Sequence, residues 1–183
     1  MTDINHMTDI NYITASEAVK SVRSGDRVYI GTSSSFAYEL VDALYDRKDE
    51  LENITLLCSM SITPCRMFDT DWPADIPPGS KGNPFIFDTF FLGAGERSAH
   101  RKHNMAFEYT SFHLSQIDLW MREIGRPDIS FLQVSRPDDK GFPCCFRGIP
   151  LSLFPPRRIC GRRFRPNRMN SGRIHRALKP AEN

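Results

Sequence analysis

The stretch SGDRVYIGTSSSFAYELVDAL, residues 24–44, predicts a turn, a buried strand, a loop of small residues and a helix in succession. Gly25 and Asp26 are turn residues, and Val28–Ile30 is the short β-branched and aromatic run typical of a buried strand. A helix follows, because apolar residues then recur along one helical face. These residues are Phe36, Ala37, Leu40, Val41 and Leu44.

The loop between that strand and that helix consists of small residues, which are Gly31, Thr32, Ser33, Ser34 and Ser35. Small residues let a backbone approach a ligand closely, and the N–H groups at a helix start suit an oxyanion, a carboxylate or a phosphate. We therefore take these five residues as the candidate substrate-binding site. The alternative is a plain strand-to-helix connection in which Ser34 or Ser35 is the N-cap.

Strands and helices alternate along the rest of the chain up to about residue 134. Further strands are expected at 54–58, 85–92, 107–112 and 129–134, and further helices after Thr14 and over 96–104 and 115–124. This alternation predicts an α/β fold, a mostly parallel sheet with helices on both faces.

Three loops would then lie at the carboxyl edge of the sheet, where ligands bind in such folds. They are 31–35, the start of the Pro-rich segment 64–84, and Gly93–Gly95. The Pro-rich segment should lack regular structure. Its Trp72 either covers a ligand or packs the segment onto the core.

The composition is that of one globular domain: 183 residues, 40% apolar and 25% charged. No stretch is apolar enough to span a membrane and the N-terminus lacks a signal pattern, so we expect a cytoplasmic location. Five cysteines without a C-x-x-C pair favour neither a disulfide framework nor a zinc site. His100 and His103 lie on an expected basic, exposed helix, and no metal is expected there.

Three stretches together resemble the N-terminal domain of the acetyl-CoA hydrolase/transferase family, which includes 4-hydroxybutyrate CoA-transferases. They are ITASEAVKSVRSGDRVYIG (13–31), FFLGAGERSAHRKHNMAFEYTSFHLSQI (90–117) and PDISFLQVSRPDDKGF (127–142). Arg136 stands where the family usually has proline. The resemblance covers residues 12–142, which we take as the domain.

The resemblance implies a CoA thioester as substrate and no covalently bound cofactor. The partners would be an acyl-CoA and a small carboxylic acid such as acetate, butyrate or 4-hydroxybutyrate. In the family a glutamate carboxylate attacks the thioester, but no position here matches that motif, so we assign no catalytic residue. Glu39, Glu96 and Glu108 are expected to be solvated. We expect a member of a CoA-transferase family that is inactive on its own because it lacks the catalytic half. The alternatives to a working part of such an enzyme are an inactive remnant or a module that binds a carboxylate or CoA.

The tail, residues 143–183, is expected to be irregular, because it is rich in Arg and Pro. Residues 1–140 hold 14 Lys and Arg against 21 Asp and Glu, a net charge of −7, whereas residues 141–183 hold ten against one, a net charge of +9. Charge, composition and resemblance all change near residue 141, which indicates a frameshift and truncation that the downstream DNA would test. The alternative is a basic arm that binds nucleic acid. The apolar face of this chain that the missing half would cover is left bare, so we expect the chain to self-associate.

Overall fold

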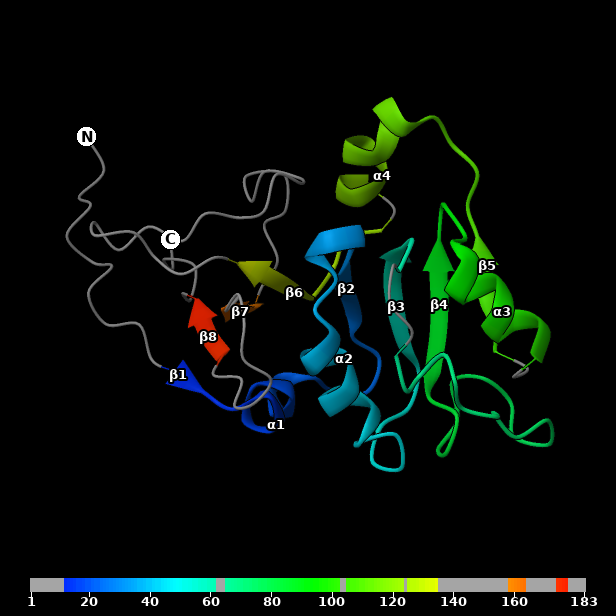
Figure 1. The fold of residues 1–183 in the computed structure, drawn as a ribbon, viewed down its shortest axis with the longest axis horizontal. Coiled ribbons are helices and arrows are strands. Elements are labelled where there is room, and N and C mark those ends of the chain that lie inside the picture. Colours follow the sequence, from blue (N-terminus) through cyan, green and yellow to red (C-terminus); the bar gives the residue numbers. More distant parts are fainter. Residues whose placement is uncertain are drawn as a thin grey trace.

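The structure is a computed structural model and describes residues 12–61, 65–102, 105–123, 125–134, 158–163 and 174–177. Strands and helices alternate over most of this length (Figure 1). Short 3₁₀ turns, labelled η, join some of them. In chain order the elements are β1 (Tyr12–Ile13), α1 (Ala15–Ala18), η2 (Val19–Ser21), β2 (Arg27–Thr32), η3 (Ser33–Ser35), α2 (Tyr38–Tyr45), β3 (Ile54–Ser59), β4 (Phe85–Thr89), α3 (Ala94–Lys102), β5 (Phe107–Tyr109), η4 (Leu114–Gln116), α4 (Ile117–Glu123), β6 (Ile129–Val134), β7 (Arg158–Arg163) and β8 (Ile174–Ala177).

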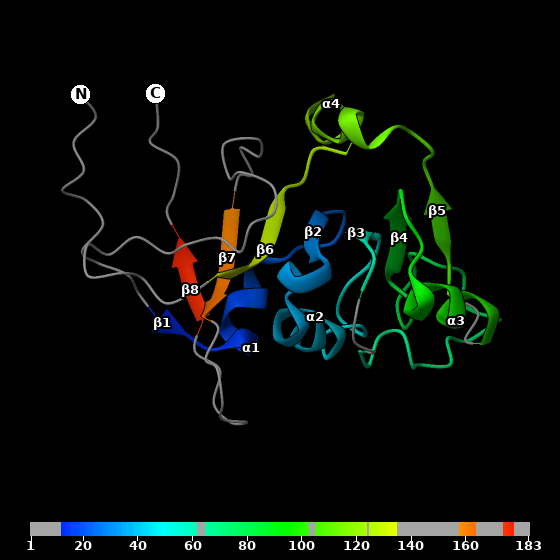
Figure 2. The same ribbon diagram turned by 45° about the horizontal axis from the view of Figure 1, so that its top comes forward.

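The strands form one sheet in the order β1-β8-β7-β6-β2-β3-β4-β5 (Figure 2). The five strands β2 to β6 are all parallel to their neighbours among themselves, and β7 is parallel to β6. Only β8 and β1, at one edge, run antiparallel to their neighbours. The predicted α/β fold with a mostly parallel sheet is therefore confirmed.

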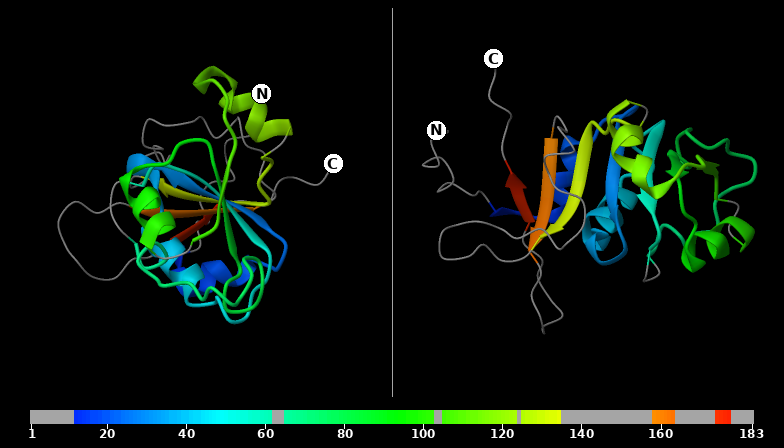
Figure 3. Two further views of the ribbon diagram at one scale, coloured as in Figure 1. Left: turned by 90° about the vertical axis from the view of Figure 1, so that its right-hand side faces the viewer. Right: turned by 90° about the horizontal axis from the view of Figure 1, so that it is seen from above.

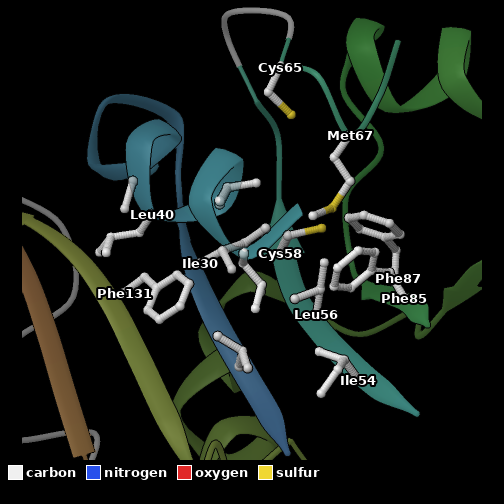
Figure 4. Close-up of a cluster of buried hydrophobic side chains, with 14 of the residues drawn as sticks. Ile30, Leu40, Ile54, Leu56, Cys58, Cys65, Met67, Phe85, Phe87 and Phe131 are labelled. Atoms are coloured by element: carbon white, nitrogen blue, oxygen red, sulfur yellow. The ribbon is translucent and has the colours of Figure 1, made fainter. Parts of the chain in front are cut away.

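Helices cover both faces of the sheet, and the two layers are unequal (Figure 3). The larger cluster joins α1, α2 and α3 to alternate residues of β2, β3, β4 and β6, among them Ile30, Leu56 and Phe131 (Figure 4). On the other face, within the part of the chain that the structure describes, α4 is the one helix present, and it places Trp120 and Met121 against the sheet beside Phe90 and Phe112. Successive residues of the central strands thus face apolar layers on opposite sides of the sheet, as expected of parallel strands buried on both faces.

Most predicted elements are present, and the differences are local. The first helix is short, because α1 gives way to the 3₁₀ turn η2, whose carbonyl at Val19 accepts a hydrogen bond from the Arg47 guanidinium. The predicted strand 85–92 ends at Thr89, since the Thr89 hydroxyl bonds the backbone of Phe91 and bends the chain there.

The described part of the Pro-rich segment, from Cys65 to Pro84, has turns and no helix or strand, as predicted. It is nevertheless packed: Met67, Phe68 and Trp72 are buried in the main cluster. The Trp72 indole N–H donates to the Met67 carbonyl at 3.1 Å. Of the two interpretations of Trp72, packing of the segment onto the core is the one that the structure supports.

Two segments of the tail that we expected to be irregular are strands. β7 continues the parallel sheet beside β6 through six paired residues, from Ile129 with Arg158 to Val134 with Arg163. β8 then returns antiparallel to β7. A sheet edge offers unpaired N–H and C=O groups to any extended segment, so backbone pairing can form there without the apolar pattern on which the sequence prediction relied. The rest of the tail lies outside the described residues.

Among the described residues, no helix combines the length and the apolar character needed to cross a membrane.

The burial of Cys65 leads to a pH-dependent stability. Burial raises the pKa of its thiol from 9.0 to about 12. Between these values the unfolded chain loses the proton and the folded chain keeps it, so stability is complete below pH 9 and falls as the pH rises. One such thiol lowers the free energy of unfolding by about 1.4 kcal/mol between pH 8 and pH 10.

We therefore expect the Cys65→Ala variant to be less stable at pH 8 but to lose less stability on going to pH 10. Urea unfolding at both pH values measures the difference. An equal pH-dependent loss in the variant and in the unmodified chain would contradict this assignment.

Candidate functional site

Three loops meet at the carboxyl edge of the sheet, after β2, β3 and β4. Two of them contain predicted residues, 31–35 and Gly93–Gly95. The loop after β3 is represented by 60–61, because the predicted start of the Pro-rich segment at Pro64 lies outside the described residues. The Ser33 N–H, after β2, donates to the Met60 carbonyl at 2.8 Å, and the Met60 N–H, after β3, donates to the Phe91 carbonyl at 3.2 Å. The backbone of Met60 thus joins the loops on either side. We call residues 31–35, 60–61 and 90–95 the edge loops.

The candidate substrate loop, Gly31–Ser35, is a tight turn held by its own hydrogen bonds. Gly31 has a φ of +81°, and a Cβ there would lie 2.3 Å from the Ser35 carbonyl oxygen. The Thr32 N–H donates to the Ser35 hydroxyl at 3.2 Å, and the Ser35 N–H donates to the Thr32 hydroxyl in return. This reciprocal pair is a capping box. It fixes the path of the chain out of β2.

These bonds occupy most of the N–H groups that we expected to face a ligand. The N–H groups of Thr32, Ser33 and Ser35 all donate to protein atoms. The hydrogen-bonding groups of this half-buried turn that remain for a ligand are therefore hydroxyls. The best candidate is the hydroxyl of Ser33, because that residue is partly exposed. Ser34 belongs to the same turn, and its side chain lies outside the described part of the structure.

Glu96 lies directly behind this edge, and the expectation that it is solvated is wrong. Its side chain is fully buried, and its Oε1 accepts the Ser61 N–H at 2.5 Å. The prediction failed because an acidic residue in the first turn of a helix is normally exposed and stabilised by the helix dipole. The signal that could have found it is the neighbouring glycines, because Gly93 makes room for its carboxyl group and Gly95 makes room for the Ser61 hydroxyl. Glu108 is exposed, as expected.

Cys58, near the end of β3, is a buried thiol. Burial raises its pKa well above the ordinary value, and the nearby Glu96 raises it further, although a hydrogen bond with Thr89 opposes the shift. A thiol in such surroundings stays protonated and is a poor nucleophile. The described edge therefore holds Cys58 as a packing residue and not as a reactive group.

A second polar cluster lies on the α4 face of the sheet. Arg27 pairs with Asp88 at 3.3 Å, and the Thr110 hydroxyl donates to the same carboxylate at 3.4 Å. Burial raises the pKa of Asp88, while Arg27 opposes that shift. The Arg27–Asp88 pair spans β3, from β2 to β4, and the Asp88 carboxylate is engaged by Arg27 and Thr110, so the cluster is a structural one.

The fold and its edge loops define an open α/β domain of the kind that binds ligands where parallel strands end. A family comparison then identifies it: the chain belongs to the acetyl-CoA hydrolase/transferase family, whose N-terminal domain it matches over residues 8–149. The resemblance found in the sequence is confirmed, and the match runs past Phe142, where we expected it to stop.

Two curated relatives are CoA-transferases. The butyryl-CoA:acetate CoA-transferase of Anaerostipes caccae is 31% identical over 130 residues, which are 70% of this chain and 27% of that protein. The probable butyrate:acetyl-CoA coenzyme A-transferase of Syntrophomonas wolfei is 25% identical over 130 residues, 71% of this chain and 27% of that protein. The chain thus spans about a quarter of the length of these relatives.

Solved structures share the fold. RipA from Yersinia pestis superimposes with a TM-score of 0.60 at 21% identity, over 78% of this chain and 33% of RipA. The M31G mutant of RipA gives a TM-score of 0.62, again at 21% identity, over 80% and 33% of the two chains. At this identity the likeness supports the fold alone.

The geometry of Gly31 predicts a large effect of a small substitution. We expect Gly31→Ala to lower the free energy of unfolding by about 3 kcal/mol, since backbone strain and a steric clash add together. The matched control is Gly25→Ala, where φ is +85° but no atom lies within 4 Å of the added carbon. It should lose only about 1 kcal/mol through strain alone. Urea unfolding of both variants measures this, and equal losses would contradict the crowding at Gly31.

Proposed function

We propose that this chain is the substrate-contacting N-terminal domain of a CoA-transferase, which moves CoA between an acyl-CoA and a small carboxylic acid. The acid would be of the acetate, butyrate or 4-hydroxybutyrate class, and the CoA thioester would be a substrate and not a bound cofactor. Family membership supports the reaction class. The names of the two relatives favour butyrate and acetate within it.

The observation that carries the proposal is that the other two edge loops, 60–61 and 90–95, meet the loop Gly31–Ser35. A rigid turn with hydroxyl groups at a carboxyl edge suits a carboxylate or a thioester oxygen, which accept hydrogen bonds. Since the N–H groups of the turn are largely occupied, the Ser33 hydroxyl would be the donor. Its turn is fixed before a ligand arrives, so little ordering would be needed on binding.

The covalent step would need a glutamate carboxylate, which attacks the thioester carbon and releases the CoA thiolate. In the family this glutamate belongs to the half that this chain does not match, and we propose no nucleophile within it. The chain alone would therefore bind without turnover, in the cytoplasm. An inactive remnant would share this fold but bind neither substrate.

Titration of the full chain with acetate, butyrate and CoA, followed by amide NMR shifts, tests the proposal. We expect shifts that saturate at residues 31–35. Ser33→Ala should weaken binding about threefold to tenfold, the effect of one lost hydrogen bond. Ser16→Ala, an exposed serine on α1, is the control and should bind as the unmodified chain does.

Absence of shifts from all three compounds would favour the inactive remnant. Exchange of CoA between acetyl-CoA and butyrate by the purified chain would show that the chain supplies its own nucleophile, against the proposal.

We also propose that the chain self-associates through its carboxyl edge. Among the described residues, the large apolar side chains left exposed lie there or on α4 above it: Met60, Phe91, Tyr109 and Leu119, with 37%, 50%, 57% and 59% exposed. Large apolar side chains left exposed in this way favour a partner surface.

We expect light scattering to give a mass above 21.0 kDa. Phe91→Ser should lower it, whereas the same change at a distant exposed residue, Lys20→Ser on η2, should not. A monodisperse monomer at high concentration would rule out this surface as a self-association site.

A further inference from the structure

Glu96 joins two of the edge loops through its carboxyl group. The side chain is fully buried, and its Oε1 accepts the N–H of Ser61, which follows β3. None of the ion pairs found among the described residues includes Glu96. Its contact is therefore with the backbone of a neighbouring loop and not with a cation.

A buried carboxyl group with this environment is costly for stability. Its Oε2 and the Ser61 hydroxyl are both buried, and neither has a hydrogen-bond partner within the described structure. Buried polar groups without partners lose their hydration and gain little in return. An apolar side chain would fill the same position at a lower cost, so packing alone does not explain a glutamate here.

The contact of Glu96 continues through the backbone to the candidate substrate loop. Ser61 follows Met60, which has an unusual φ of +32° for a residue other than glycine. The Met60 carbonyl accepts the Ser33 N–H at 2.8 Å. A hydrogen bond that holds Ser61 therefore also holds the strained Met60 and, through it, the turn at Ser33.

The glycines around Glu96 are shaped for this arrangement. A Cβ at Gly93 would lie 2.6 Å from Glu96 Oε2, and one at Gly95 would lie 3.0 Å from the Ser61 hydroxyl. Gly93 thus leaves space for the carboxyl group of Glu96, and Gly95 leaves space for the Ser61 side chain beside it.

We infer that Glu96 is a positioning residue, whose carboxyl group fixes the backbone of Met60 and Ser61 and thereby the orientation of Gly31–Ser35. The importance of that loop for a ligand rests on the function proposed above. The coupling between Glu96 and Ser33 does not rest on it and can be measured without any ligand.

Hydrogen–deuterium exchange of the full chain, resolved to single amides, tests the coupling. In Glu96→Ala we expect the amide protons of Ser61 and Ser33 to exchange about tenfold faster or more, since the Ser61 N–H loses its acceptor and the Met60 carbonyl that accepts from Ser33 is held less firmly. Glu96→Gln keeps the acceptor oxygen and should restore most of the protection. Glu108→Gln makes the same chemical change at an exposed position and should alter neither amide.

The amide of Leu56 in β3 separates positioning from a general loss of stability, because it lies in the core. Its exchange should change less than about twofold if the effect is confined to the edge loops. Unchanged exchange at Ser33 in Glu96→Ala, or an equal increase at Leu56, would overturn the inference. If Glu96→Ala does not fold, faster exchange at Ser61 in Glu96→Gln without any change at Ser33 overturns it equally.

A titration with acetate separates this inference from the proposed function. If the unmodified chain shows no acetate-induced shifts at residues 31–35, the proposed function fails for acetate, while the exchange result still decides the role of Glu96. If the shifts occur, Glu96→Ala should weaken acetate binding about threefold or more, with Glu96→Gln close to the unmodified chain.

Discussion

The two backbone hydrogen bonds of Met60 are the constraint on which the arrangement at the carboxyl edge depends. Parallel strands bring β2, β3 and β4 to the same edge, but they do not fix the loops that follow. Met60 does so, because its carbonyl accepts from Ser33 and its N–H donates to Phe91. The turn at Gly31 and the buried carboxyl group of Glu96 then shape that edge from opposite sides.

The fold could be predicted from the sequence because its helices and strands have strong local patterns. The β-branched run before Gly31 and the apolar helical face after it lead to β2 and α2, and the apolar run at 54–58 leads to β3. Element ends were less accessible: β4 stops at Thr89 because a side-chain hydroxyl bonds the backbone of Phe91, which no periodicity records. The strands β7 and β8 depend on backbone pairing at a sheet edge, which carries little signal in side-chain pattern.

The sequence predicted where in the fold the candidate site lies better than it predicted which hydrogen-bonding groups are available there. Residue spacing placed Gly31–Ser35 and Gly93–Gly95 at one edge, and the parallel sheet brings them there. Which N–H groups remain for a ligand depends on long-range bonds such as that from Ser33 to Met60. The burial of Glu96 likewise depends on a loop 35 residues away, so an isolated reading of its helix gives the wrong environment.

The unequal covering of the sheet has a consequence for how the domain opens. On one face three helices share a continuous core, whereas on the other, among the described residues, one helix, α4, packs with Phe90 and Phe112 over Tyr29 and Leu57. The apolar cluster under α4 is smaller than the main core, so detachment of α4 uncovers less apolar surface and costs less free energy than global unfolding. Local opening of the domain is therefore expected to begin at α4, because fewer apolar side chains hold that layer than hold the layer that contains α2.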